Sequence, residues 1–263
     1  MSSRVLKSLL SLVALTVLSL AAGCSDDATS PATTLTQDEA DDLATQVAAT
    51  LALDNGGTLA VLPALDVGEH PAAKIAPPPT DGETTIGGFT YRYQTRFFNA
   101  AGDTMANYDP LLTVRLQTLL RAAGEITTVR YQAQVRHRSQ FEVQGVNAPA
   151  DSLKFNGTCS DTCQSSFTAL MVQYQRHFRL ESQAQVQNVA YLKPVESGEL
   201  PCSGVMTWQM TAARYMDAAR TQLAAQLRAT VTVRFTGGDT AALEVEGGWT
   251  YQLNLRTGEI VRT

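Results

Sequence analysis

From residue 89 onward, apolar and polar residues alternate along most of the chain. The first example is FTYRYQTRF at 89–97, where aromatic residues take every second position apart from Thr95 and the intervening positions are polar. A period of two belongs to a β-strand, because successive side chains point to opposite faces of a sheet. The segment therefore predicts a strand with one dry face and one wet face.

The same alternation recurs in later segments, which lie at 112–121, 129–143, 170–186, 206–210, 222–235, 243–245 and 249–255. Glycine-containing turns such as TGGD, EGG and RTGE separate several of them. One dry and one wet face favour an antiparallel sheet. We predict a mainly β domain at 87–263, an antiparallel meander of about nine strands. Two strands of roughly 18 residues would span about 60 Å if straight, so we expect them to bend or bulge and the sheet to curl into a half-barrel or sandwich.

A helical pattern precedes the strands at 36–55. Thr36 is a candidate N-cap, Glu39 completes a capping box, and apolar residues recur at helical spacing from Ala40 to Leu51. We predict an amphipathic helix that lays its apolar stripe on the main domain; binding of a partner protein is the alternative. The polar segment 24–35 is interpreted as a flexible tether, and 56–86, rich in proline, as a linker or cover strip. A second sheet, the helix or this strip must cover the dry face.

The amino terminus shows a different pattern. Arg4 and Lys7 precede an apolar run of about a dozen residues, which is shorter than the roughly 20 that a membrane-spanning helix needs. Such a run is typical of a secretory signal peptide. It ends in Ala21, Ala22 and Gly23, followed directly by Cys24. This junction resembles the lipobox of bacterial lipoproteins, with the leucine at Leu20, one place further from the cysteine than in the commonest form.

The resemblance implies that residues 1–23 are removed and that Cys24 becomes the first residue of the mature protein. Its sulfur would carry a diacylglycerol and its amine a further acyl chain, which together anchor the protein to a membrane. Ser25 follows the cysteine. In the sorting scheme of bacteria with two membranes, a serine there implies the outer membrane.

The net charge and the cysteines limit the kinds of partner and site that the protein can have. Loss of Arg4 and Lys7 would move the net charge from −5 to −7, and this acidity argues against nucleic acid as a partner. Export to an oxidising compartment favours disulfides, and CSDTC makes a local Cys159–Cys163 pair our first choice. Cys202 would then be free, or would pair with one of these two instead. The spacing suggests no metal site and no cofactor.

The sequence contains no nucleophile elbow, P-loop or HExxH motif. Two polar residues do interrupt otherwise dry faces, His137 and Arg176, each within one of the two long strands. If those two strands pair with each other around a 146–167 connection, the two residues lie opposite one another. A His137–Arg176 pair on an apolar face would suit an anionic ligand group. The alternative interpretation places one or both at a sheet end or bulge.

These patterns favour an envelope lipoprotein whose β domain is non-catalytic and has a structural or binding role. Its partners would be the membrane, through the anchor, and an envelope protein, glycan or lipid. The arginines of the wet face could attract anionic glycan or lipid groups, or serve only to keep the sheet soluble. The alternative function is a carrier that holds a lipid or another amphiphile in a cavity on the dry face. An enzyme is the third possibility.

Overall fold

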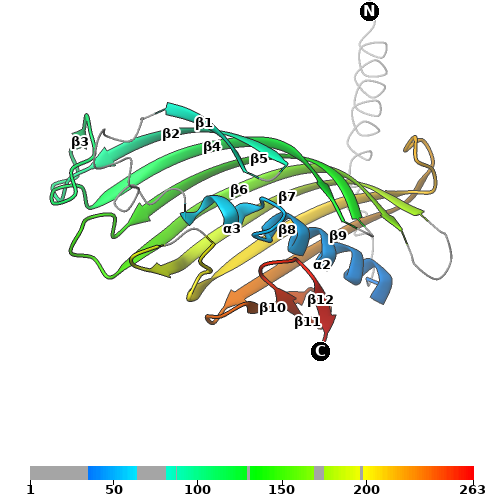
Figure 1. The fold of residues 1–263 in the computed structure, drawn as a ribbon. Helices are drawn as coiled ribbons and strands as arrows, with labels where there is room; N and C mark the ends of the chain where they lie inside the picture. Colours follow the sequence, from blue (N-terminus) through cyan, green and yellow to red (C-terminus); the bar gives the residue numbers. More distant parts are fainter. Residues whose placement is uncertain (1–34, 64–80, 87, 129–130, 169–174, 196–197) are drawn as a thin grey trace, which may run out of the picture. The chain divides into compact units, whose positions relative to one another are not determined.

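The structure, a computed structural model, describes residues 35–63, 81–86, 88–128, 131–168, 175–195 and 198–263 of the 263-residue chain. These residues form two helices and one β-sheet (Figure 1). The helices are α2 (Gln37–Leu51) and α3 (Thr58–Val61). The strands are β1 (Asp81–Ile86), β2 (Phe89–Phe98), β3 (Thr104–Met105), β4 (Arg115–Thr127), β5 (Tyr131–Gln144), β6 (Ser152–Thr168), β7 (Gln175–Leu192), β8 (Ser203–Tyr215), β9 (Leu223–Phe235), β10 (Thr240–Val245), β11 (Trp249–Asn254) and β12 (Ile260–Arg262).

All described strands belong to one antiparallel sheet that follows chain order from β1 to β12, except that the short β3 pairs only with β2. The sheet is open, because β1 and β12 are its two edges and do not pair with each other. This arrangement confirms the mainly β, antiparallel prediction. The predicted number of about nine strands is wrong, since the sheet has 12. The sandwich alternative is also wrong, since the described strands do not divide into two sheets.

Four strands escaped the sequence analysis because their residues do not show the expected pattern. β1 is an edge strand without a buried side chain, and it lies within the segment predicted to be a linker. β3 and β12 have only two and three residues. β6 occupies most of the segment taken as the 146–167 connection, and two of its inward positions are the polar residues Asp161 and Ser165. A buried strand with polar inward residues does not produce a simple apolar alternation.

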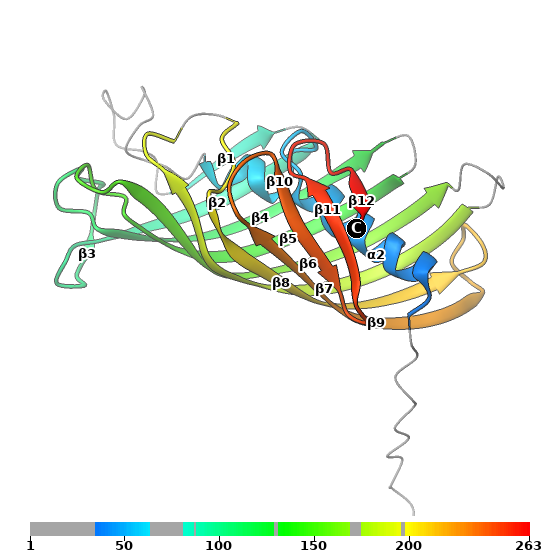
Figure 2. The ribbon, with the colours of Figure 1, turned by 90° about the horizontal axis from the view of Figure 1, so that it is seen from below.

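The long strands bend through bulges, as expected. The pairing of β6 with β7 shifts between Phe155 and Gly157, and the pairing of β7 with β8 shifts between Gln187 and Ala190. Asn188, inside the second irregularity, has a φ of 51°. Each extra residue increases the local twist of the strand that carries it. The sheet consequently curves, and Figure 2 shows it bending around α2.

α2 begins as the sequence predicts. Thr36 accepts a hydrogen bond from the Glu39 amide, and the Glu39 carboxylate accepts one from the Thr36 amide, which completes the capping box. The helix packs against β9, β10, β11 and β12. The face of the sheet that meets α2 is called the inner face below, and the opposite face the outer face. The expected docking of the helix on the main domain is confirmed.

The inner face carries the core. Phe155 on β6 is fully buried and makes edge-to-face contacts with Phe141 on β5 and Tyr191 on β7. Phe167 and Phe178 form a similar pair further along β6 and β7. Such geometry places the positive ring edge against the negative ring face of the neighbour. The outward positions of the same strands are mostly exposed and polar.

Candidate functional site

Buried ion pairs join the first turns of α2 to the sheet. Arg176 on β7 contacts Asp42 at 3.0 Å and Asp38 at 3.4 Å, and Arg214 on β8 contacts Glu39 at 3.0 Å. Asp42 and Glu39 are buried, whereas Asp38 is largely exposed. A buried carboxylate is costly unless a cation stands beside it. The two arginines therefore determine where the helix can dock.

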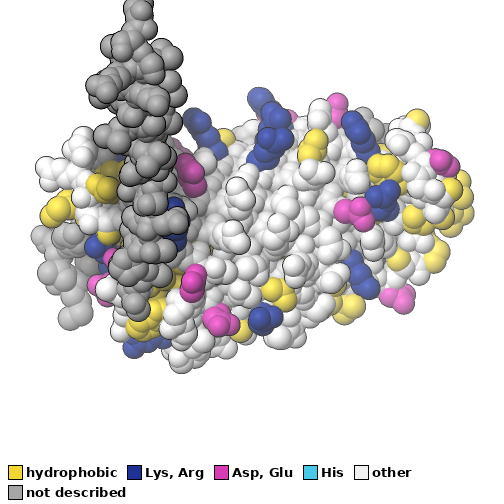
Figure 3. All heavy atoms as spheres, turned by 180° about the vertical axis from the view of Figure 1, so that it is seen from behind, with side chains coloured by type: hydrophobic (Ala, Val, Ile, Leu, Met, Phe, Trp, Pro, Cys, Tyr) yellow, Lys and Arg dark blue, Asp and Glu magenta, His cyan; other side chains and the backbone are white. Residues whose placement is uncertain are grey.

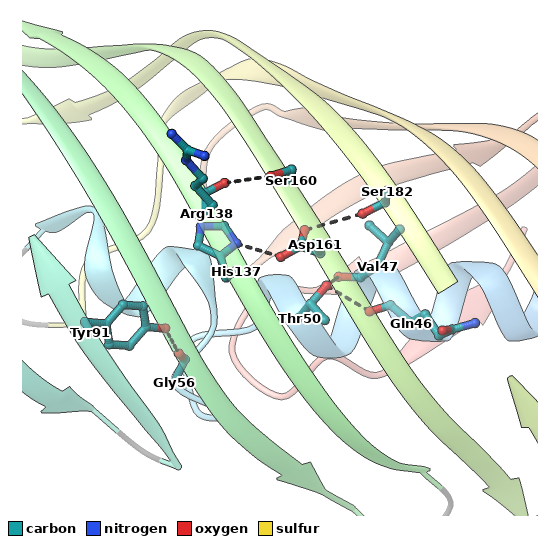
Figure 4. Close-up of polar contacts among 10 residues, drawn as sticks. All are labelled: Gln46, Val47, Thr50, Gly56, Tyr91, His137, Arg138, Ser160, Asp161 and Ser182. Carbon is teal, nitrogen blue, oxygen red and sulfur yellow. Dashed lines mark hydrogen bonds and ion pairs between the residues drawn. The ribbon is translucent and has the colours of Figure 1, made fainter. Parts of the chain in front are cut away.

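Hydrogen bonds continue this contact along the helix. Tyr251 on β11 donates to the Asp41 carboxylate at 2.7 Å, and Ser165 on β6 donates to the Gln46 side-chain oxygen at 3.1 Å. The Tyr91 hydroxyl on β2 donates to the backbone oxygen of Gly56, just after the helix (Figure 4). Residues from β2 to β11 thus hold the helix on the inner face.

Burial raises the pKa of Asp42 to about 7, against an ordinary value of 3.8. Desolvation is the largest cause, and Asp38 and Asp41 act in the same direction. The positive charges of Arg176 and Arg214 oppose this rise. Near neutral pH this carboxyl group is therefore close to the midpoint of its titration in the folded protein.

We expect the contribution of Asp42 to stability to decline as the pH rises. The folded protein binds a proton at Asp42 more tightly than the unfolded chain does, because its pKa is raised on folding. The contribution is full below about pH 4 and is lost as the pH rises through about 7. Relative to an Asp42→Asn variant, the free energy of unfolding of the unsubstituted protein should therefore fall between pH 5 and pH 8, as measured by urea unfolding.

The matched control is Asp38→Asn, which removes the exposed carboxylate beside the same guanidinium. This variant should keep most of the pH dependence. His177 is buried and has a lowered pKa, so it contributes a trend of the opposite sign that cancels in the comparison. Parallel pH profiles for the unsubstituted protein and the Asp42→Asn variant would contradict the prediction.

A second polar cluster lies near the middle of the inner face (Figure 4). His137, Asp161 and Ser182 lie directly opposite one another on β5, β6 and β7. Asp161 Oδ1 is 2.6 Å from His137 Nδ1, and Ser182 Oγ donates to Asp161 Oδ2 at 3.4 Å. The side chains of His137 and Asp161 are each only 10% exposed.

This cluster does not have the geometry of a hydrolytic site. A serine nucleophile needs a base that accepts its proton, and the third group then orients that base. Here the carboxylate stands between the serine and the histidine, so Ser182 bonds to Asp161 and not to the imidazole. The arrangement instead gives a buried carboxylate two donors, which stabilises its charge. The sequence pattern did not reveal Asp161 and Ser182 as partners of His137.

The predicted His137–Arg176 pair is not formed. Both residues contact acidic groups on the inner side of the sheet, but β6 lies between β5 and β7, so the two long strands do not pair with each other. His137 is opposite Asp161, and Arg176 is opposite Phe167. Each has its own carboxylate partner. The register behind the prediction was wrong because it treated β6 as a loop.

The predicted Cys159–Cys163 disulfide is also contradicted. Both cysteines lie on β6 with free, buried thiols, and Cys202 is free as well. In an extended strand, residues four apart are separated by about 13 Å, which is far beyond the reach of a disulfide. Burial raises the pKa of Cys163 to about 11 and raises that of Cys159 as well. Both thiols therefore stay protonated and poorly nucleophilic.

A small cavity lies between the middle of α2 and the sheet. Its volume is about 10 Å³, and it is lined by residues that include Gln46, Asp161, Cys163 and Trp208. That volume is comparable to a single water molecule. A pocket for a drug-sized ligand has a volume of roughly 300–1,000 Å³. At this place, the side chains of the helix and of the sheet occupy the room that an amphiphile would need.

Larger open spaces lie on the outer face. One hollow of about 560 Å³ is lined by residues that include Ser160, Gln183, Gln209 and Thr211. A second, of about 530 Å³, is lined by residues that include Gln134, Arg136, Gln164 and Arg179. Both also include Thr162 and Glu181, so they adjoin. The two hollows together are called the outer groove below. Figure 3 shows this face of the molecule, where most side chains are neither hydrophobic nor charged.

Some predicted features lie outside the described residues. Cys24, the candidate lipid attachment site, is one of them, as is the rest of the signal peptide and most of the tether. Within the described part of the chain, no group of three or more His, Cys, Asp or Glu side chains is arranged to hold a metal ion. The described helices are also too short or too polar to cross a membrane.

A scan against protein-family models finds no match, and neither a search of the curated proteins nor a search of the solved structures finds a similar protein.

Proposed function

We propose that this protein is a lipid-anchored component of a bacterial cell envelope, and that its β domain is a non-catalytic binding module. In this proposal the domain is a half-barrel that is closed on its inner side by its own helix. The anchor is Cys24, and the outer membrane is the destination that Ser25 favours. The module binds another component of the envelope through its outer face.

This proposal rests on the difference in open space between the two faces of the sheet. The cavity beneath α2 is about 10 Å³, whereas the outer face has open hollows of about 560 and 530 Å³. The carrier alternative needs space on the inner face and therefore has less support. The order of Ser182, Asp161 and His137 favours a structural cluster over a hydrolytic one. The polar outer face has the donors and acceptors that a hydrated ligand needs.

A sedimentation experiment tests the proposal. The mature chain from residue 24, with Cys24→Ser so that it cannot be lipidated, is mixed with envelope fragments prepared from cells that lack the protein. We expect saturable co-sedimentation that unlabelled protein displaces. Native mass spectrometry of the same preparation should show the mass of the polypeptide alone. Absence of saturable binding would contradict the binding role, and a stoichiometric co-purified lipid would favour the carrier.

A further inference from the structure

Three arginines lie directly opposite one another on the outer face. Arg92 on β2 is the partner of Arg121 on β4, and Arg121 is the partner of Arg138 on β5. These three residues are called the arginine row below. All three are exposed. Like charges in opposed positions of a sheet repel one another and destabilise it.

A carboxylate neutralises the positive charge at only one end of the arginine row. Arg92 forms an ion pair with Glu83 on β1 at 2.6 Å. Among the described residues, no ion pair or side-chain hydrogen bond involves the guanidinium groups of Arg121 and Arg138. Glu142 on the same face of β5 pairs with Arg115, and Glu125 on β4 accepts a hydrogen bond from Gln134. The row therefore keeps an uncompensated positive charge in a chain whose net charge is −5.

The arginine row adjoins the outer groove. Arg136, which follows the same face of β5, lines one hollow of the groove. Ser160, the residue opposite Arg138, lines the other. Arg179 and Arg228 also line the groove, on β7 and β9, but Glu125, Glu181 and Glu246 line it as well, so the net positive charge of this surface is that of the arginine row. In Figure 3, groups of basic side chains lie along the upper part of this face.

We propose that the arginine row and the outer groove together bind an acidic polysaccharide. This inference rests on the proposed binding function and names its ligand class. Neighbouring strands are about 4.8 Å apart, so a linear chain that crosses the strands meets one guanidinium on each of β2, β4 and β5. Guanidinium groups bind carboxylate and phosphate through paired hydrogen bonds. The glutamine and threonine side chains of the groove supply donors and acceptors for sugar hydroxyls.

Two other polyanions fit this surface less well. Single-stranded nucleic acid binds through aromatic side chains on which the bases stack, and the exposed large hydrophobic residues of the described chain include no aromatic residue. A bilayer of anionic lipids presents a broad surface that would span the rims of the hollows. A single polymer strand can enter them, which is why a polysaccharide is the occupant that the geometry favours.

Binding to defined polymers tests this inference. The mature chain from residue 24 with Cys24→Ser is titrated with phosphorylated dextran, with oligogalacturonate and with uncharged dextran of similar length. We expect binding to at least one acidic polymer and none to uncharged dextran. In the Arg121→Gln/Arg138→Gln variant, the affinity for the acidic polymer should fall about tenfold, because two exposed ion pairs are each worth up to about 1 kcal/mol.

The matched control is Arg234→Gln/Arg262→Gln, which removes the same charge from exposed positions on β9 and β12. Arg234 on β9 is four strands from β5, about 19 Å, and four residues, about 13 Å, from Thr230, where the groove ends on β9. Both distances exceed the screening length of roughly 8 Å at physiological salt. The control should change the affinity less than about twofold. The thermal unfolding midpoints of both variants, followed by circular dichroism, check that the sheet remains folded.

Several outcomes would overturn the inference. One is an absence of binding to both acidic polymers, and another is an equal loss of affinity in the arginine-row variant and in the control. The third is binding to oligothymidylate or to phosphatidylglycerol vesicles that is as tight as, or tighter than, binding to the acidic polymers. The sedimentation experiment distinguishes failure of the acidic-polysaccharide inference from failure of the proposed binding function. If the row variant still binds envelope fragments fully, the acidic polysaccharide is wrong and the binding role stands. If the parent protein does not bind them, the function itself fails.

Discussion

Replacing Cys24 with serine is expected to move the protein from the membrane fraction to the soluble fraction almost completely. The lipobox resemblance places the diacylglycerol on the sulfur of this residue, and the removal of the sulfur prevents that attachment. Each acyl methylene contributes about 0.8 kcal/mol to membrane binding, so the loss of several chains lowers the partition constant by many orders of magnitude. Fractionation after a wash at high ionic strength measures this, because such a wash screens contacts between the β domain and charged envelope components.

Metabolic labelling with radioactive palmitate provides the second measurement. The unsubstituted protein should incorporate the label, and Cys24→Ser should not. Cys202→Ser is the matched control, since it removes a free thiol that is partly exposed, and it should retain both the label and the membrane location. A Cys24→Ser protein that remains in the washed membranes would show that something other than the acyl chains holds it there.

Replacing Phe155 with alanine is expected to reduce the free energy of unfolding by about 3–5 kcal/mol. The ring is fully buried and makes edge-to-face contacts with Phe141 and Tyr191, so its loss leaves a cavity between β5, β6 and β7. Urea unfolding of the Cys24→Ser protein, with and without the additional substitution, measures the difference. The size of the effect depends on β6 being a buried strand within the sheet.

Lys154→Ala is the matched control because Lys154 precedes Phe155 on β6 and points to the exposed face. It should change the free energy of unfolding by less than about 0.5 kcal/mol. If Phe155→Ala and Lys154→Ala had similarly small effects, residues 152–168 would be a surface connection, and the strand order around β6 would need revision. The pair therefore distinguishes the observed sheet from the one that the sequence predicted.

The parts of the fold that depend on local pattern could be predicted from the sequence. The capping box at Thr36 and Glu39 fixes the start of α2, since both of its hydrogen bonds lie within four residues. The alternation of apolar and polar residues identified β2, β4, β5 and β7, and it placed the start of β9 at about residue 222, within one residue of the observed Leu223. The predictions failed where contacts with a neighbouring strand determine the structure. Asp161 can occupy an inward position only because His137 and Ser182 satisfy its carboxylate.

The candidate site depends on register, which alternation alone does not determine. The sequence indicated correctly that His137 and Arg176 interrupt a dry face, but it did not reveal that β6 and α2 supply their acidic partners. Arg92, Arg121 and Arg138 were likewise predicted to lie on a wet face. The three arginines lie opposite one another because β2 pairs with β4 and β4 pairs with β5. A register shift of two residues in either pairing would keep every side chain on its face of the sheet. The three arginines would then no longer lie opposite one another.

The contact between Asp41 and Tyr251 joins residues that are 210 positions apart in the chain, whereas each principal strand of the meander pairs with a strand near it in sequence. Neighbouring strands can therefore assemble in chain order, while α2, although it is made early, completes its contacts only when the last strands are in place. A polypeptide cut short before β11 would lack the Tyr251 hydrogen bond and the packing of α2 against β11 and β12, so α2 should be more accessible to proteases. The protease resistance of α2 would thus report whether the last strands of the sheet are in place.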